Sequence, residues 1–226
     1  AIPREAGATL CIADAGAFHR GVDAAAAALR AQFRGLEDRL EVRVQPAAPP
    51  PDAWSEADSQ RLLDVLRSVP SGVVALSSDI PGLVETSSNL GVVRTRGDSA
   101  EILMLARSSV APALAGLIDT HRSLARLAGA RLAYLGGYPG WQPDLGSHAL
   151  GVTRRAYARV FGHEPQVTAV HAGLECGLIG ERVPGMDMVS FGPTLEGVHA
   201  PGERVNIASV SRFWRLLAAV IEDLGA

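Results

Sequence analysis

Apolar residues recur at helical spacing in several stretches of the chain, and each such stretch predicts an amphipathic helix. In the first, Phe18, Val22, Leu29 and Phe33 share one face, and the pattern continues to Leu40 with charged residues between. A second helix is expected after Ser55, which is placed to cap it, and before Pro70, which would stop it. Further helices are expected over residues 114–128, over 147–161, from Gly173, and from Ser209 to Ile221.

Short runs of apolar and β-branched residues between these stretches predict β-strands. The clearest are 83–94 and 101–108, which flank a Thr-Arg-Gly-Asp-Ser turn and predict a hairpin. The other expected strands are 9–13, 40–44, 131–135, 166–170 and 187–191.

The order of these elements predicts an α/β (α+β) protein of two parts. Residues 1–136 follow the split βαβ pattern of a ferredoxin-like domain, an antiparallel sheet with helices on one face, with one inserted helix. Residues 137–226 alternate helices with two short buried strands, which suggests a parallel sheet but is too few strands for a complete doubly wound domain. We therefore expect the second part to be the end of a domain that begins upstream of Ala1, and the chain to have been cut from something longer.

Composition and charge narrow the class of protein. The chain is 47% hydrophobic and 20% charged, as in ordinary globular proteins. A net charge of −3 without any basic run argues against binding to nucleic acid or to an anionic membrane. All 21 basic residues are arginine, which excludes a lysine Schiff base and a P-loop lysine. Cys11 and Cys176 fit no metal-binding spacing, and no signal peptide or long apolar run is present, so a cytoplasmic location is expected.

Two of three histidine-containing stretches are candidates for chemistry. His199 lies in a loop bounded by Gly and Pro, where it could be a metal ligand or a solvated loop residue. His171 and Glu175 belong to a strand-to-helix turn that could contact a substrate, with Gly173 allowing close approach of the backbone, or could be a tightly packed turn. His121 falls on an apolar helix face and is expected to be a core histidine.

Several longer motifs, taken in order, carry a resemblance to a known family. They are Ala-Ile-Pro-Arg-Glu-Ala at 1–6, Glu-Thr-Ser-Ser-Asn-Leu-Gly-Val-Val at 85–93, Arg-Ser-Ser-Val at 107–110, Leu-Ala-Gly-Ala at 127–130, Gly-Tyr-Pro-Gly-Trp at 137–141, His-Ala-Gly-Leu-Glu-Cys-Gly-Leu at 171–178, Met-Asp-Met-Val-Ser at 186–190, and Gly-Pro-Thr at 192–194 followed by His199 and Pro201. Together they resemble the second half of aminoacyl-histidine dipeptidases, also called Xaa-His or cytosol non-specific dipeptidases, of the M20 clan of di-zinc metallopeptidases.

The resemblance implies roles for individual residues. A ferredoxin-like lid, inserted into an α/β catalytic domain that holds two zinc ions, would be followed here by the last part of that domain. His199 would be a zinc ligand, Arg107 would bind the C-terminal carboxylate of a dipeptide, and Gly173 would lie against the substrate near the metals. Asn89 has no role that we can assign, and a structural turn is expected for it.

The remaining zinc ligands and the general base of the family lie upstream and are absent from this chain. A hydrolytic zinc site needs about three protein ligands per metal and a base, and the chain supplies one ligand. We therefore expect a parent dipeptidase that cleaves unblocked dipeptides, and a chain that is inactive and binds zinc weakly or not at all by itself. The alternatives are a non-catalytic binding or dimerisation module that forms a homodimer through the lid, and an aminoacylase or tripeptidase paralogue of the same clan.

Overall fold

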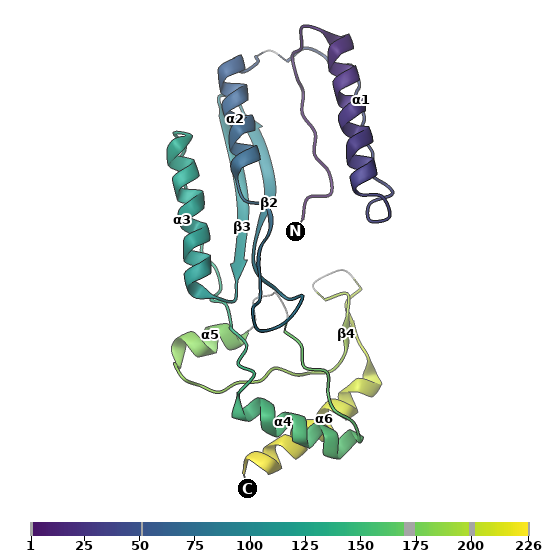
Figure 1. The fold of residues 1–226 in the computed structure, drawn as a ribbon, viewed down its shortest axis with the longest axis vertical. Helices are drawn as coiled ribbons and strands as arrows, with labels where there is room; N and C mark the ends of the chain where they lie inside the picture. The colour runs from purple at the N-terminus through teal and green to yellow at the C-terminus, as the bar shows by residue number, and fades with distance from the viewer. Residues whose placement is uncertain (1, 51, 170–174, 199–201, 226) are drawn as a thin grey trace. The chain divides into compact units, whose positions relative to one another are not determined.

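The computed structural model describes residues 2–50, 52–169, 175–198 and 202–225 (Figure 1). In these ranges the chain has a mixed α/β architecture in which a small antiparallel sheet is accompanied by helices. The chain divides into two compact units, one of Ala1–Arg67 with Gly91–Ile102 and one of Ser68–Leu90 with Leu103–Ala226. The expected boundary between a lid and a catalytic segment after residue 136 stays a prediction.

The first unit contains helix α1 (Ala15–Gln32) and most of helix α2 (Glu56–Ser68). Asp14 caps α1 by accepting a hydrogen bond from the Ala17 amide at 2.9 Å. The predicted cap of α2 is confirmed, since Ser55 Oγ accepts from the Asp58 amide at 3.1 Å and donates to Asp58 Oδ2 at 2.7 Å. The first helix ends earlier than its apolar pattern suggested, so that Leu36 and Leu40 lie beyond it.

The sheet has the strand order β1–β2–β3, formed by β1 (Gly72–Leu76), β2 (Val84–Arg96) and β3 (Ser99–Ser108). The predicted hairpin is confirmed: β2 and β3 are joined by the two-residue turn Gly97–Asp98. Strand β1, which the sequence did not suggest, pairs antiparallel with β2 and contains two register irregularities. Helix α3 (Ala111–Leu127) follows β3 and ends before Gly129, whose φ of 68° fits a left-handed helix end.

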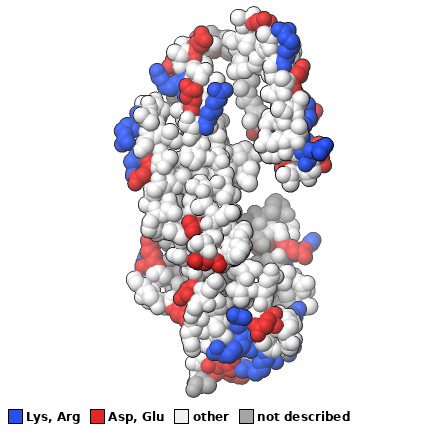
Figure 2. Space-filling view, viewed as in Figure 1, with Lys and Arg blue, Asp and Glu red and all other residues white. Residues whose placement is uncertain are grey.

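The second unit also contains helices α4 (His148–Phe161), α5 (Glu175–Arg182) and α6 (Ile207–Leu224) and a two-stranded ladder of β4 (Leu195–Glu196) and β5 (Arg204–Val205). Helices α4 and α6 pack on each other through a cluster of buried apolar side chains: Val152, Ala156, Leu216, Ala219 and Val220. An ion pair also joins the two helices, between Arg159 and Asp223 at 2.8 Å. Figure 2 shows acidic and basic side chains interspersed over these two helices.

Five expected strands do not form in the described residues. Residues 9–13, 40–44, 131–135 and 187–191, and the described part of 166–170, are extended or irregular without ladder partners. A strand requires a neighbouring strand to pair its backbone groups, and the period-2 pattern of a segment does not provide one. These predictions were wrong for the chain by itself, although the helices expected around them are present.

The buried face of helix α6 also differs from the one predicted. The sequence suggested one buried stripe of six residues, but the buried positions are Leu216, Ala219 and Val220. Trp214 is 68% exposed and Ile221 is 61% exposed. With Ile207 and Val210 these side chains form a second apolar face at helical spacing, on the solvent side of α6. No helix among the described residues is long and apolar enough to span a membrane.

Candidate functional site

Arg107 is the candidate substrate-binding residue that the structure describes. It is the second-last residue of β3, and its side chain is exposed. Side chains along β3 alternate between the two faces, so Arg107 shares a face with Leu103 and Leu105, opposite to the buried Ser108. The strand therefore presents a guanidinium group at its end, where a carboxylate could be bound by paired hydrogen bonds.

Ser108, next to Arg107, is held by buried hydrogen bonds. Its Oγ lies 2.8 Å from Thr86 Oγ1 on β2 and accepts a hydrogen bond from the Val110 amide at 3.0 Å. The Ser109 amide donates to the Glu85 carbonyl oxygen at 3.2 Å. The backbone that carries Arg107 is thus fixed to the neighbouring strand, and sequence patterns did not single out this pair of hydroxyl groups.

Two glycines, one in the 137–141 motif and one in the 171–178 motif, lie where backbones approach closely. A Cβ atom on Gly140 would overlap the carbonyl oxygen of Ser108 and lie 2.9 Å from Ser109 Cα. A Cβ atom on Gly177 in α5 would overlap the carbonyl oxygen of Pro139. The segment 137–141 is therefore in van der Waals contact with the end of β3 and also with α5.

Asp187 belongs to the Met-Asp-Met-Val-Ser motif, whose resemblance implies no role for it, and the structure assigns it one. Its Oδ1 accepts from Ser147 Oγ at 2.5 Å and its Oδ2 accepts from the Ala149 amide at 2.7 Å, at the first turn of α4. These bonds, the Ser147 hydroxyl first, lower the pKa of the Asp187 carboxyl below its ordinary value. Asp187 thereby ties the segment after α5 to the start of α4.

The 171–178 motif is partly described. His171 and Gly173 lie outside the described residues, so their expected roles stay predictions. Glu175 is the first residue of α5, and burial raises the pKa of the adjacent Cys176 thiol, with a smaller contribution from Glu175. Asn89 lies within β2, so the expectation of a turn for it was wrong.

His199 also lies outside the described residues, but the base of its loop is described. Strands β4 and β5 pair Leu195 with Val205 and Glu196 with Arg204, and the latter side chains form an ion pair at 2.5 Å. The Asn206 amide donates to the Thr194 carbonyl oxygen at 2.9 Å. Within the described part of the chain, no group of three or more His, Cys, Asp or Glu side chains could hold a metal ion.

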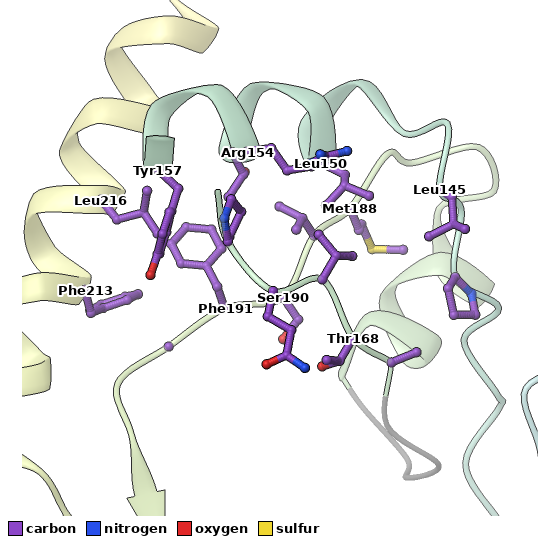
Figure 3. A pocket seen from close by; sticks show the side chains of 18 of the residues that line it. Leu145, Leu150, Arg154, Tyr157, Thr168, Met188, Ser190, Phe191, Phe213 and Leu216 are labelled. Atoms are coloured by element: carbon purple, nitrogen blue, oxygen red, sulfur yellow. The ribbon is translucent and has the colours of Figure 1, made fainter. Parts of the chain in front are cut away.

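The second unit contains a groove of about 490 Å³ between α4, α6 and the extended residues 165–169 and 188–192. Figure 3 shows Leu150, Tyr157, Phe191, Phe213 and Leu216 pointing toward it, so much of its wall is apolar. Arg154, Ser190 and Thr168 add polar groups at its margins. Its walls include two of the segments that were expected to be strands.

Comparison with known proteins identifies two relatives that match most or all of the chain. No protein-family model matches it. The cytosol non-specific dipeptidase of Escherichia coli (strain K12) is 36% identical over 228 residues, which cover 100% of this chain and 47% of that protein. The crystal structure of aminoacylhistidine dipeptidase from Vibrio alginolyticus matches with a TM-score of 0.83 and 35% identity, over 91% of this chain and 42% of that chain.

The chain thus spans about half the length of the relatives that it matches. Both relatives carry the name of a dipeptidase, in agreement with the resemblance seen in the motifs. The protein is homologous to cytosol non-specific and aminoacylhistidine dipeptidases over part of their length, and is related to this family of hydrolases.

Proposed function

We propose that this chain is the C-terminal part of a zinc-dependent dipeptidase that hydrolyses the peptide bond of unblocked dipeptides, with the Xaa-His type as substrates. The observation that carries the proposal is the 36% identity over the full length of the chain to a named dipeptidase. Because the chain matches less than half of that relative, we expect it to be inactive by itself. The relative's name also supports a cytosolic location.

In this proposal residues 1–136 form a ferredoxin-like lid and residues 137–226 form the last part of an α/β catalytic domain. The antiparallel sheet and α3 support the first assignment, because α3 packs on β2 through Ser88 and His121. The paired helices α4 and α6, with extended segments beside them, support the second.

Arg107 binds the C-terminal carboxylate of the dipeptide in this proposal. Its guanidinium group is exposed on a strand whose end is fixed by the hydrogen bonds of Ser108 and Ser109. A charge-assisted pair of this kind is worth more once water is excluded from it, so a free carboxylate is favoured over an amide. Gly173 is proposed to lie against the same substrate.

The described residues do not form a zinc site by themselves. We propose His199 as one ligand to zinc, with the other ligands supplied by the part of the dipeptidase that this chain does not span. The β4–β5 ladder supports this assignment, since it fixes both ends of the loop that contains His199.

The rest of the catalytic domain is proposed to cover the second apolar face of α6 and the groove of Figure 3. A helix that is apolar on two sides belongs in the interior of a domain, and Trp214 and Ile221 leave such a side exposed. The extended segments 166–169 and 187–191 have apolar residues and unformed ladders, so added strands would pair with them.

Reconstitution tests the function. The chain would be mixed with a polypeptide corresponding to the part of the E. coli dipeptidase that it does not match, in the presence of zinc. We expect hydrolysis of L-alanyl-L-histidine by the pair and by neither polypeptide alone. Arg107→Ala should reduce the activity of the pair, and His199→Ala should abolish it.

Trp214→Ala provides the structural arm of that experiment. It should weaken association of the two polypeptides and leave the stability of the isolated chain nearly unchanged, because Trp214 is 68% exposed. A pair that associates tightly and hydrolyses no dipeptide would contradict the proposed function. Turnover by the chain alone would contradict its expected inactivity.

A second candidate function, a homodimerisation module, is favoured by one observation. Strand β1 is at the edge of the sheet, and Val73, Val74 and Leu76 on it are exposed. The register irregularities in β1 oppose pairing of that edge with another strand. A dilution series followed by size-exclusion chromatography without zinc would separate the two functions, because only the second requires a concentration-dependent dimer.

A further inference from the structure

We propose that Gly140 and Gly177 are positioning residues that set the direction in which Arg107 is presented to the substrate carboxylate. The inference rests on the proposed function, because it concerns Arg107 as the carboxylate ligand. Its basis is a stack of three backbones formed by the end of β3, the segment 137–141 and α5.

The first layer of the stack is the strand end. Ser108 is buried and is bonded through its Oγ to Thr86 and to the Val110 amide. Arg107 and Ser108 are adjacent in β3 and point to opposite faces, so a shift of the Ser108 backbone also shifts the backbone from which the Arg107 side chain starts. The placement of the guanidinium group therefore depends in part on what holds Ser108 in place.

The second and third layers are Gly140 and Gly177. Gly140 lies against the carbonyl group of Ser108, and a methyl group there would overlap its oxygen and also meet Ser109 Cα. Gly177, itself buried, lies against the carbonyl group of Pro139, one residue before Gly140. Neither neighbour is the flexible end of a side chain, so an added methyl group moves a backbone in each case.

The two glycines differ in this respect from other glycines of the chain. In α5 itself, a Cβ atom on Gly180 would meet Met188 Cε at 3.1 Å, which is the mobile end of a long side chain. In α3, a Cβ atom on Gly116 would meet nothing within 4 Å. The absence of a side chain is thus required at Gly140 and Gly177 for contact between backbones. Gly116→Ala is the control for replacing glycine by alanine at a position without such a contact.

General magnitudes for positioning elements and for charged hydrogen bonds set the expected size of the effect. A displacement of about 1 Å in a positioning element is enough to reduce a catalytic rate by about 100-fold in enzymes. For binding alone, loss of one hydrogen bond to a charged group corresponds to a change of about tenfold or more. We therefore expect the preference for a free carboxylate to fall by about tenfold when either glycine becomes alanine.

The experiment measures binding to the full chain, without requiring turnover. L-Alanyl-L-histidine and its C-terminal amide are titrated into the chain and followed by ¹H–¹⁵N NMR at the Arg107 amide. The variants are Gly140→Ala, Gly177→Ala, Arg107→Ala, the double variant Arg107→Ala/Gly140→Ala, and Gly116→Ala as the matched control. Thermal unfolding of each variant identifies any that fails to fold.

We expect the wild-type chain and Gly116→Ala to bind the free dipeptide more tightly than the amide. Gly140→Ala and Gly177→Ala should lose this preference, and Gly140→Ala should have no further effect once Arg107 is alanine.

A folded Gly140→Ala or Gly177→Ala that keeps the wild-type preference overturns the proposal, as does a wild-type chain with no preference. If Gly140→Ala does not fold, Gly177→Ala decides, since its added methyl group is one layer further from Ser108. Failure of the reconstituted pair to hydrolyse dipeptides is a separate outcome that counts against the proposed function alone.

Discussion

Two regions of the second unit bury side chains in contrasting ways. Between α4 and α6 the buried cluster is apolar, with Val152 and Leu216 among its members. Between α3 and the sheet, the apolar Leu117 is buried, but so are the polar side chains of Thr86, Ser108 and His121. Both regions exclude water, but they are stabilised by different contributions.

The contrast shows what each region requires of its sequence. An apolar cluster depends on volume and shape, so its stability responds to lost methylene groups and little to pH. A buried polar cluster depends on each donor finding an acceptor, so its stability responds to loss of one partner and to protonation. The strand end that carries Arg107 belongs to the second kind, which fits a site that must hold a definite direction.

The largest effect is expected in the apolar region. Leu216→Ala removes a buried side chain from the α4–α6 cluster and should lower the free energy of unfolding by about 2–5 kcal/mol. Ile221→Ala removes a similar volume from the exposed face of the same helix and should change it by no more than about 0.5 kcal/mol. Urea unfolding of both variants checks this, and equal losses would mean that α6 does not have one packed and one open face in the isolated chain.

A smaller effect is expected in the polar region. Thr86→Val keeps the shape of a side chain that is 1% exposed but removes its hydroxyl, and should cost about 1–3 kcal/mol by leaving Ser108 Oγ without that partner. The double variant Thr86→Val/Ser108→Ala should lose less than the sum of the two single variants, because it leaves no orphaned hydroxyl. Strict additivity in chemical unfolding would show that the two hydroxyl groups do not depend on each other.

The same contrast explains how much of the fold the sequence could predict. Helices α1 to α6 were all expected, because an amphipathic pattern and its caps act within one segment. Strands β2 and β3 were expected because a short turn joins them, whereas residues 9–13 and 40–44 have strand patterns without a partner in the described chain. The exposed apolar face of α6 was not predicted for the same reason. The apolar pattern of the helix identifies residues that need burial, but it does not identify the segments that would bury them.

The candidate site was predicted unevenly for a physical reason. Arg107 was found through a motif, and the structure places its exposed side chain at the end of β3. The contacts that fix the strand end come from Thr86 and Gly140, which are distant in sequence, and no local pattern links them to Arg107. Asp187 was visible only as a motif residue, because its partners at the start of α4 are 40 and 38 residues away in the chain.

The smallest expected effect is a pH dependence of the free energy of unfolding, which also distinguishes the polar region from the apolar one. His121 on α3 is buried with its Nε2 3.3 Å from Ser88 Oγ, and burial lowers its pKa from the ordinary 6.5. The unfolded chain therefore binds a proton at a higher pH than the folded chain does, and stability rises with pH across the interval between the two pKa values. The contribution of neutral His121 is complete above about pH 6.5 and declines below it.

Asp187, which bonds to the start of α4, makes a contribution that also rises with pH, but in a separate and lower pH interval. Its folded pKa lies below the ordinary 3.8, so its contribution is present above that value and is lost only as the pH falls through the folded pKa. The free energy of unfolding measured between pH 5 and pH 7.5 should thus report the titration of His121 and not that of Asp187.

The variant His121→Gln keeps a side-chain nitrogen that can bond to Ser88 but cannot titrate, so it should flatten the pH dependence of stability in that range. If His121→Gln instead retains the full wild-type slope, the polar region is not the source of the pH response, and this part of the contrast between the two regions fails.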